Sequence, residues 1–160
     1  MNYKTAYDIQ EDLGRKAFSQ LIKNTVKDVP EIKYEQDPYS IFDASFTYKN
    51  AQNITKYVFV EIKVRSRKFN EYILESKKFN AMHNIYKSKN IKKEDVSLLY
   101  VNFCPDGSFI WDMDEIESKY TLQDSIFNRN TTESRYNKTQ KQVYYLKTSD
   151  AIKYNFIIKQ

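Results

Sequence analysis

The spacing of hydrophobic residues in the first part of the chain predicts one amphipathic helix. Over residues 5–25, apolar side chains such as Leu13, Ala17 and Leu21 recur at steps of four, which places them on one face of an α-helix. The helix is expected to end before Pro30, because proline interrupts helical hydrogen bonding.

A strand hairpin is predicted next. After a short strand candidate at 31–36, residues 40–48 alternate between apolar and polar side chains. Residues 56–65, KYVFVEIKVR, alternate as well and are rich in β-branched and aromatic types. A polar segment joins the two runs, so the simplest arrangement for 41–64 is an antiparallel hairpin.

The second half of the chain predicts a helix, a strand pair and a less regular tail. Residues 71–90 have apolar side chains spaced as in a helix of about five turns. Residues 96–103 are a buried strand candidate, and a Cys-Pro-Asp-Gly turn connects them to a partner strand within 108–116. Residues 117–141 are polar and basic without a clear period, so we expect a loop there, followed by one short strand.

This order of elements predicts an α/β fold with a central mixed β-sheet flanked by helices. No repeat or linker divides the chain, so residues 1–160 are expected to form a single domain. No apolar run approaches the roughly 20 residues that span a bilayer, and the first residues lack the pattern of a signal peptide. We therefore expect a cytoplasmic protein with no membrane partner. The abundance of Lys, Asn, Tyr and Ile is typical of an AT-rich genome such as that of a phage or a mobile element.

The candidate chemistry lies at the end of the strand at 56–65. One face of this strand carries β-branched residues such as Val58 and Val60, whereas the other, aromatic face ends on Glu61 and Lys63. The spacing acid-x-Lys is uninformative alone, because the chain contains four such pairs where about three are expected by chance. This pair differs because it ends a strongly apolar strand and because an aspartate stands in the strand before it.

That aspartate, Asp43, predicts a paired carboxylate site. If the hairpin has an even register, Asp43 and Glu61 share a face, and Lys63 shares it with them. Two carboxylates held close together repel each other unless a cation lies between them. With one cysteine and one histidine in the chain, a zinc site built from thiolates and imidazoles is excluded, and oxygen ligands suit Mg²⁺, Mn²⁺ or Ca²⁺.

Asp43 followed by Glu61-Ile62-Lys63 at the end of an apolar strand resembles the PD-(D/E)XK nuclease superfamily. The resemblance covers residues 5–113 and implies a restriction-endonuclease-like core in the order αβββαβ, with a C-terminal extension. It implies that Asp43, Glu61 and the Ile62 backbone carbonyl bind Mg²⁺, with Mn²⁺ as a substitute, and that Lys63 assists the attacking water.

Two further features belong to the same comparison. The family often adds an acid from the first helix and a polar residue from the second, and Glu11 and Lys78 are the nearest candidates here. The proline of the family's name is absent, since Phe42 precedes the aspartate.

The resemblance implies a nuclease that hydrolyses phosphodiester bonds, with DNA favoured over RNA and a homodimer as one expected assembly. The net charge of +5 is compatible with a polyanionic partner. The candidate nucleic-acid contacts are Arg65, Arg67, Arg129, Arg135, Lys138 and Lys141.

Several alternatives stay open at this point, and one is an interaction or structural protein with no nucleic-acid role. The fold could serve a catalytically inactive protein that binds nucleic acid or a protein partner. The Glu61 and Lys63 side chains could also form a solvated pair at a sheet edge, contributing at most about 1 kcal/mol. Lys78 could then be an ordinary surface lysine whose stem lies along the helix.

Overall fold

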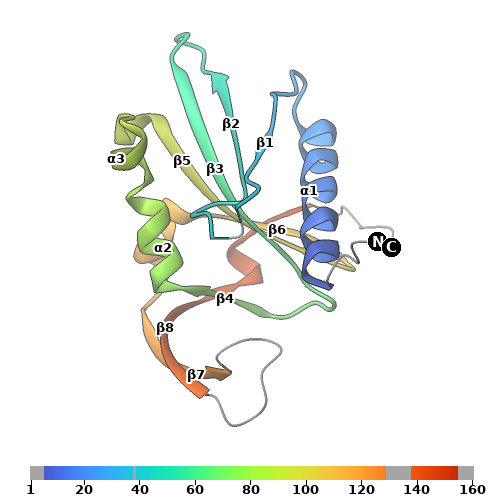
Figure 1. Ribbon diagram of the computed structural model, residues 1–160, viewed down its shortest axis with the longest axis vertical. Coiled ribbons are helices and arrows are strands. Elements are labelled where there is room, and N and C mark those ends of the chain that lie inside the picture. Colours follow the sequence, from blue (N-terminus) through green and yellow to red (C-terminus); the bar gives the residue numbers. More distant parts are fainter. Residues whose placement is uncertain (1–5, 38, 129–137, 155–160) are drawn as a thin grey trace.

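The computed structural model describes residues 6–37, 39–128 and 138–154 and has two β-sheets with helices around them (Figure 1). The larger sheet has six strands in the order β1-β2-β3-β5-β6-β9. Its strands are β1 (Lys33–Tyr34), β2 (Ala44–Lys49), β3 (Thr55–Val64), β5 (Val96–Cys104), β6 (Gly107–Asp112) and β9 (Ile152–Tyr154). Strands β3 and β5 run parallel and the other neighbours run antiparallel, so the sheet is mixed and the α/β class is confirmed.

The smaller sheet has three strands in the order β4-β8-β7. They are β4 (Glu71–Glu75), β8 (Lys138–Lys147) and β7 (Gln123–Asn128), all antiparallel. The helices are α1 (Ala6–Thr25), α2 (Ser76–His83), α3 (Ile85–Lys89) and α4 (Ile116–Lys119), with short 3₁₀ turns η1 (Lys93–Asp95), η2 (Met113–Glu115) and η3 (Thr148–Asp150). None of the helices in the described ranges is long and apolar enough to cross a membrane.

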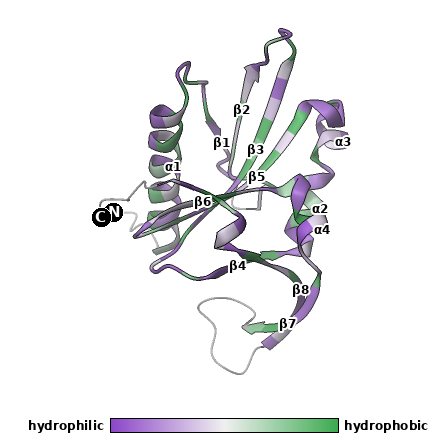
Figure 2. Cartoon of the chain, turned by 180° about the vertical axis from the view of Figure 1, so that it is seen from behind, coloured by the Kyte–Doolittle hydropathy of each residue, from purple (hydrophilic) through white to green (hydrophobic). Residues whose placement is uncertain are grey.

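Helix α1 lies on one side of the larger sheet, and α2 and α3 lie on the other (Figure 1). The alternation along β3 explains this layering, because Val58 and Val60 pack with Phe18 of α1, whereas Phe59 packs with Phe42 and the α2 side. The hydropathy colours are consistent with this packing of α1 on the sheet, because the helix alternates between hydrophilic and hydrophobic residues as an amphipathic helix does (Figure 2).

The hairpin predicted at 41–64 is present as β2 and β3, and its register is even. Ala44 pairs with Val60 and Ser45 with Phe59, so the residue before β2, Asp43, faces the position of Glu61. The helix predicted at 5–25 and the pair formed by β5 and β6 are also confirmed.

The helix predicted at 71–90 is wrong over its first turn and is interrupted in its middle. Residues 71–75 form β4, in which Tyr72 and Leu74 alternate into the core with 2% exposure each. The helical segments then break at Asn84, which ends α2 and precedes α3. Pairing with β8 outweighs the weak helical spacing of the first residues.

The loop predicted at 117–141 is also wrong for the residues that the structure describes. Strand β7 and the start of β8 lie in this segment. Strand β7 is at the edge of its sheet, and Ile126 is 69% exposed. Because such an edge strand buries few side chains, its sequence can be polar and lack a regular apolar alternation.

Candidate functional site

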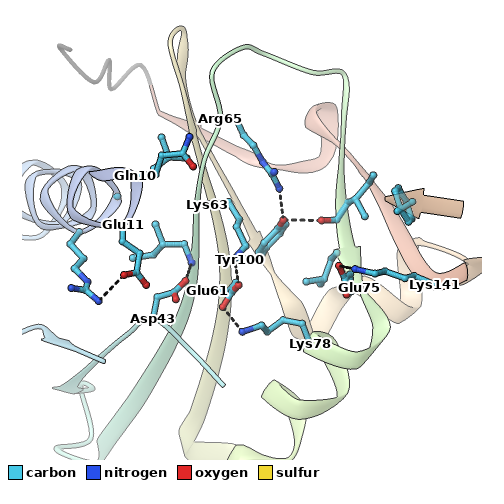
Figure 3. Close-up of a pocket in the computed structure, with 17 residues that line it drawn as sticks. Gln10, Glu11, Asp43, Glu61, Lys63, Arg65, Glu75, Lys78, Tyr100 and Lys141 are labelled. Atoms are coloured by element: carbon cyan, nitrogen blue, oxygen red, sulfur yellow. Dashed lines mark hydrogen bonds and ion pairs between the residues drawn. The ribbon is translucent and has the colours of Figure 1, made fainter. Parts of the chain in front are cut away.

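The end of β3 forms the floor of a cavity of about 710 Å³, whose lining residues are drawn in Figure 3. Helix α1 contributes one wall through Gln10 and Glu11, and strands β4 and β8 contribute the other through Glu75 and Lys141. The sequence candidates Asp43, Glu61, Ile62, Lys63, Arg65, Lys78, Glu11 and Lys141 all line this cavity.

Glu61 is the most buried charged group of the cavity, with 1% of its surface exposed. Its Oε1 lies 2.6 Å from Lys63 Nζ, and its Oε2 lies 2.9 Å from Lys78 Nζ. Burying a carboxylate without partners is strongly unfavourable, so these two ammonium groups stabilise Glu61 in its buried position. The Lys78 contact is an ion pair without hydrogen-bond alignment, and within the described residues Oε2 has no hydrogen-bond partner. The solvated-edge alternative for Glu61 therefore does not hold.

Asp43 stands directly before β2 and points toward the end of β3. Its backbone N–H donates to the Val60 carbonyl at 2.9 Å, and its Oδ2 accepts from the Ile62 N–H at 2.6 Å. Burial and, to a smaller extent, the Glu61 carboxylate raise the pKa of Asp43 to about 6 against the opposing effect of Lys63. The pKa of Asp43 therefore depends on the charge of Glu61.

Lys63 keeps its proton in this setting. Burial works against the ammonium form, but the Glu61 carboxylate outweighs it and the pKa of Lys63 is raised above its usual range. With 42% of its side chain exposed, the ammonium group stays accessible from the cavity.

Lys78 of α2 links the site to the segment that precedes Asp43. Its Nζ donates to the carbonyl of Ile41 at 3.0 Å and, more weakly, to that of Ser40 at 3.4 Å, in addition to the ion pair with Glu61. The side chain is 29% exposed and points into the cavity rather than along the helix surface (Figure 3). The surface-lysine alternative is thereby excluded.

Arg65 and Tyr100 extend the cavity beyond Lys63. Arg65 Nε donates to Asn102 Oδ1 at 3.1 Å. Its Nη2 donates to the Tyr100 hydroxyl at 3.4 Å, and that hydroxyl donates to the Ile73 carbonyl at 2.8 Å (Figure 3). No local sequence pattern identifies Tyr100, since only the parallel pairing of β3 with β5 places it beside Glu61.

Glu11 reaches the cavity because α1 approaches β3 closely. A Cβ on Gly14 would lie 3.1 Å from the Ile62 Cγ2 and 3.2 Å from the Val64 Cγ2, so a larger residue would hold the helix away. Glu11 itself pairs with Arg15 at 3.6 Å.

The remaining basic candidates are spread out. Lys141 lines the cavity and pairs with Glu75 at 2.7 Å. Lys138 is exposed at the start of β8, and the guanidinium of Arg67 lies over the Phe69 ring. Neither residue is among the described residues that line the cavity. The other two predicted contacts, Arg129 and Arg135, lie outside the described residues.

The cavity offers few side-chain ligands for a hard divalent cation. Across the ranges 6–37, 39–128 and 138–154, no three or more His, Cys, Asp or Glu side chains gather as metal ligands. Asp43 and Glu61 nevertheless supply two carboxylates whose mutual repulsion a cation would relieve. Such a cation would compete with Lys63 and Lys78 for the oxygens of Glu61.

No protein-family model matches the chain, and a search of curated proteins gives no significant match. The chemistry of the site is therefore inferred from its own residues and their geometry.

Proposed function

We propose that the protein is a Mg²⁺-dependent nuclease of the PD-(D/E)XK type that hydrolyses phosphodiester bonds in DNA. The observation that carries this proposal is the meeting of Asp43, Glu61 and Lys63 on the floor of one cavity, in the even register that the site needs. The element order also supports it, because a helix and the β2–β3 hairpin precede α2 and β5.

Asp43 and Glu61 would hold the Mg²⁺ ion, and the resemblance adds the backbone carbonyl of Ile62. Mn²⁺ has the same preference for oxygen ligands and would serve as a substitute. When bound, such an ion polarises a phosphoryl oxygen and lowers the pKa of a coordinated water.

The lysines supply the positive charge that the reaction needs. Because its pKa is raised, Lys63 is an ammonium ion near neutral pH, so it donates hydrogen bonds to a phosphate oxygen or to the attacking water and does not remove the water's proton. Its donation stabilises the charge that develops on the phosphoryl oxygens. Lys78 fixes Glu61 and the segment before Asp43, so it positions the two carboxylates.

A nuclease assay with matched variants tests the proposal. Linear, circular, branched and single-stranded DNA would be incubated with the wild type, Asp43→Asn and Lys63→Ala in Mg²⁺, Mn²⁺ or EDTA. We expect both variants to lose at least about 100-fold in rate, since each removes a charge that acts on the reacting phosphate.

The matched control is Lys119→Ala. Lys119 belongs to the same acid-x-Lys spacing in α4, and it is an exposed residue paired with Glu115 rather than a cavity residue. Its loss should leave the rate unchanged. Equal activity of the wild type, Asp43→Asn and Lys63→Ala would show that the site is wrongly assigned.

A second candidate function is a nuclease-like domain that binds nucleic acid or a protein without cutting. One observation favours it, because each carboxylate oxygen of Glu61 has a lysine partner with which a metal ion would compete. Titration calorimetry with Mg²⁺ separates the two candidates. Absence of metal binding together with intact nucleic-acid binding would select the inactive protein.

A further inference from the structure

The cavity has a second wall that the proposed reaction does not use, and strand pairing determines which residues form it. Glu75 of β4 pairs with Val143 of β8, and Lys141, two residues earlier in β8, shares that face. Lys141 pairs with Ser125 of β7, and Phe127 lies two residues further along the same face. This face of the smaller sheet therefore turns Glu75, Lys141 and Phe127 to the cavity, all three of which line it.

Phe127 is an aromatic ring placed outside the core. The other face of the smaller sheet carries residues such as Tyr144 and Leu146, which belong to a buried cluster with Phe79. Among the described residues, Phe127 is a member of neither buried cluster, although it is half-buried and lines a cavity whose other residues are mostly charged or polar. A flat apolar surface in such a cavity offers a place for a ring to stack.

Arg65 is the cation of this cavity that has no acidic partner among the described residues. Lys63 and Lys78 pair with Glu61, Lys141 pairs with Glu75, and Arg15 pairs with Glu11. The contacts of the Arg65 guanidinium go instead to neutral groups, the Asn102 side-chain carbonyl and the Tyr100 hydroxyl. These contacts fix the guanidinium without neutralising it, which leaves its charge available to an anion such as a phosphate.

We propose that the cavity receives a single, unpaired nucleic-acid strand, with one base stacked on Phe127 and a phosphate next to the reacting one bound by Arg65. The inference rests on the proposed function, because it names the form of substrate that the same site takes. A base inside a duplex has both faces covered by its neighbours, so only an unpaired base can stack on a ring within a cavity. Stacking is tolerant of sequence, so the strand is recognised by its form rather than by its bases.

The test measures binding of the full-length protein without metal, so that it does not depend on cleavage. Fluorescence anisotropy in EDTA at low ionic strength would give dissociation constants for a labelled single-stranded oligonucleotide and for a blunt duplex of the same sequence. The single strand should bind more tightly. Phe127→Ala should weaken its binding roughly 5- to 100-fold, the range expected for loss of one stacked base, and Phe127→Trp should restore it.

Two control variants sharpen the test. Ile126→Ala changes the neighbouring residue on the opposite face of β7, which is 69% exposed, and should leave the dissociation constant unchanged. Arg65→Gln should weaken binding and reduce the slope of log affinity against log salt by about one ion, whereas Lys49→Gln, at an exposed residue of β2 outside the cavity, should not. Circular dichroism of each variant confirms that β7 and its sheet remain folded, and the Phe127→Trp protein provides a second check.

Equal binding of duplex and single strand, or equal behaviour of Phe127→Ala and Ile126→Ala, would overturn the inference. Its failure can be told apart from that of the nuclease proposal. A protein that binds single strands through Phe127 and cleaves nothing supports the inference and rejects the nuclease. A protein that cleaves duplex DNA, with Phe127→Ala as active as the wild type, rejects the inference and keeps the nuclease.

Discussion

The position of Asp43 in the site opposes its ionisation. Glu61 is compensated by two lysines, whereas burial and the Glu61 charge raise the pKa of Asp43 from its ordinary value of 3.8 to about 6. The folded protein therefore binds a proton at Asp43 more readily than the unfolded chain does. Ionised Asp43 destabilises the fold above about pH 6, and this penalty fades as the pH falls through 6 toward 4. A raised pKa of this kind is typical of carboxylates at functional sites.

Asp43→Asn should consequently stabilise the metal-free protein. The amide keeps an oxygen for the Ile62 N–H but carries no charge, so the free energy of unfolding should rise by about 1 to 2 kcal/mol near pH 8 and change little near pH 4. Urea denaturation at the two pH values measures this. Asp106→Asn, an exposed substitution, should change stability by less than about 0.5 kcal/mol. A loss of stability in Asp43→Asn near pH 8 would contradict the expectation.

Lys78→Ala should destabilise the protein and lower its activity. The substitution leaves Glu61 Oε2 without its ion-pair partner and frees the carbonyl of Ile41, for which we expect a loss of about 1 to 3 kcal/mol. Lys77, the exposed neighbour in α2, provides the matched control, and Lys77→Ala should change stability by less than about 0.5 kcal/mol. Thermal unfolding and the nuclease rate would be measured for both variants. Indistinguishable variants would show that Lys78 has no positioning role.

At the scale of secondary structure, sequence patterns predicted elements whose partners are local. Helix α1 and the β2–β3 hairpin follow from apolar spacing alone, and alternation within the hairpin places Asp43 and Glu61 on one face. The candidate residues of the site could therefore be named from sequence, because a hairpin register leaves only two choices of face.

The elements that the sequence missed depend on distant partners. Strand β4 is short, its residues also fit a helical spacing, and it pairs with β8, whose sequence lies more than 60 residues later. Tyr100 and Phe127 carry no local signal of function, since each reaches the cavity only through the pairing of its strand. Non-local pairing of this kind is not encoded in the spacing of neighbouring residues.

At the scale of the whole molecule, the site exists because three layers meet at the end of β3. Helix α1 covers the larger sheet from one side, and the smaller sheet approaches from the other, so the floor and both walls of the cavity come from segments between residues 10 and 141. The site is therefore sensitive to the stability of the fold as a whole, and a ligand that binds it should stabilise the fold.

Magnesium should reverse the order of stability between the wild type and Asp43→Asn. A ligand present at about 100 times its dissociation constant stabilises the folded state by about 2.7 kcal/mol, which raises the Tm of a chain of this size by roughly 5 to 10 °C. Asp43→Asn lacks one carboxylate ligand and should gain little. In EDTA the variant should therefore melt above the wild type, and in saturating Mg²⁺ below it. Glu115→Gln, an exposed acid outside the cavity, should respond to Mg²⁺ as the wild type does. Parallel shifts in the wild type and Asp43→Asn would mean that magnesium binds elsewhere, and the paired carboxylates would then not be the metal site.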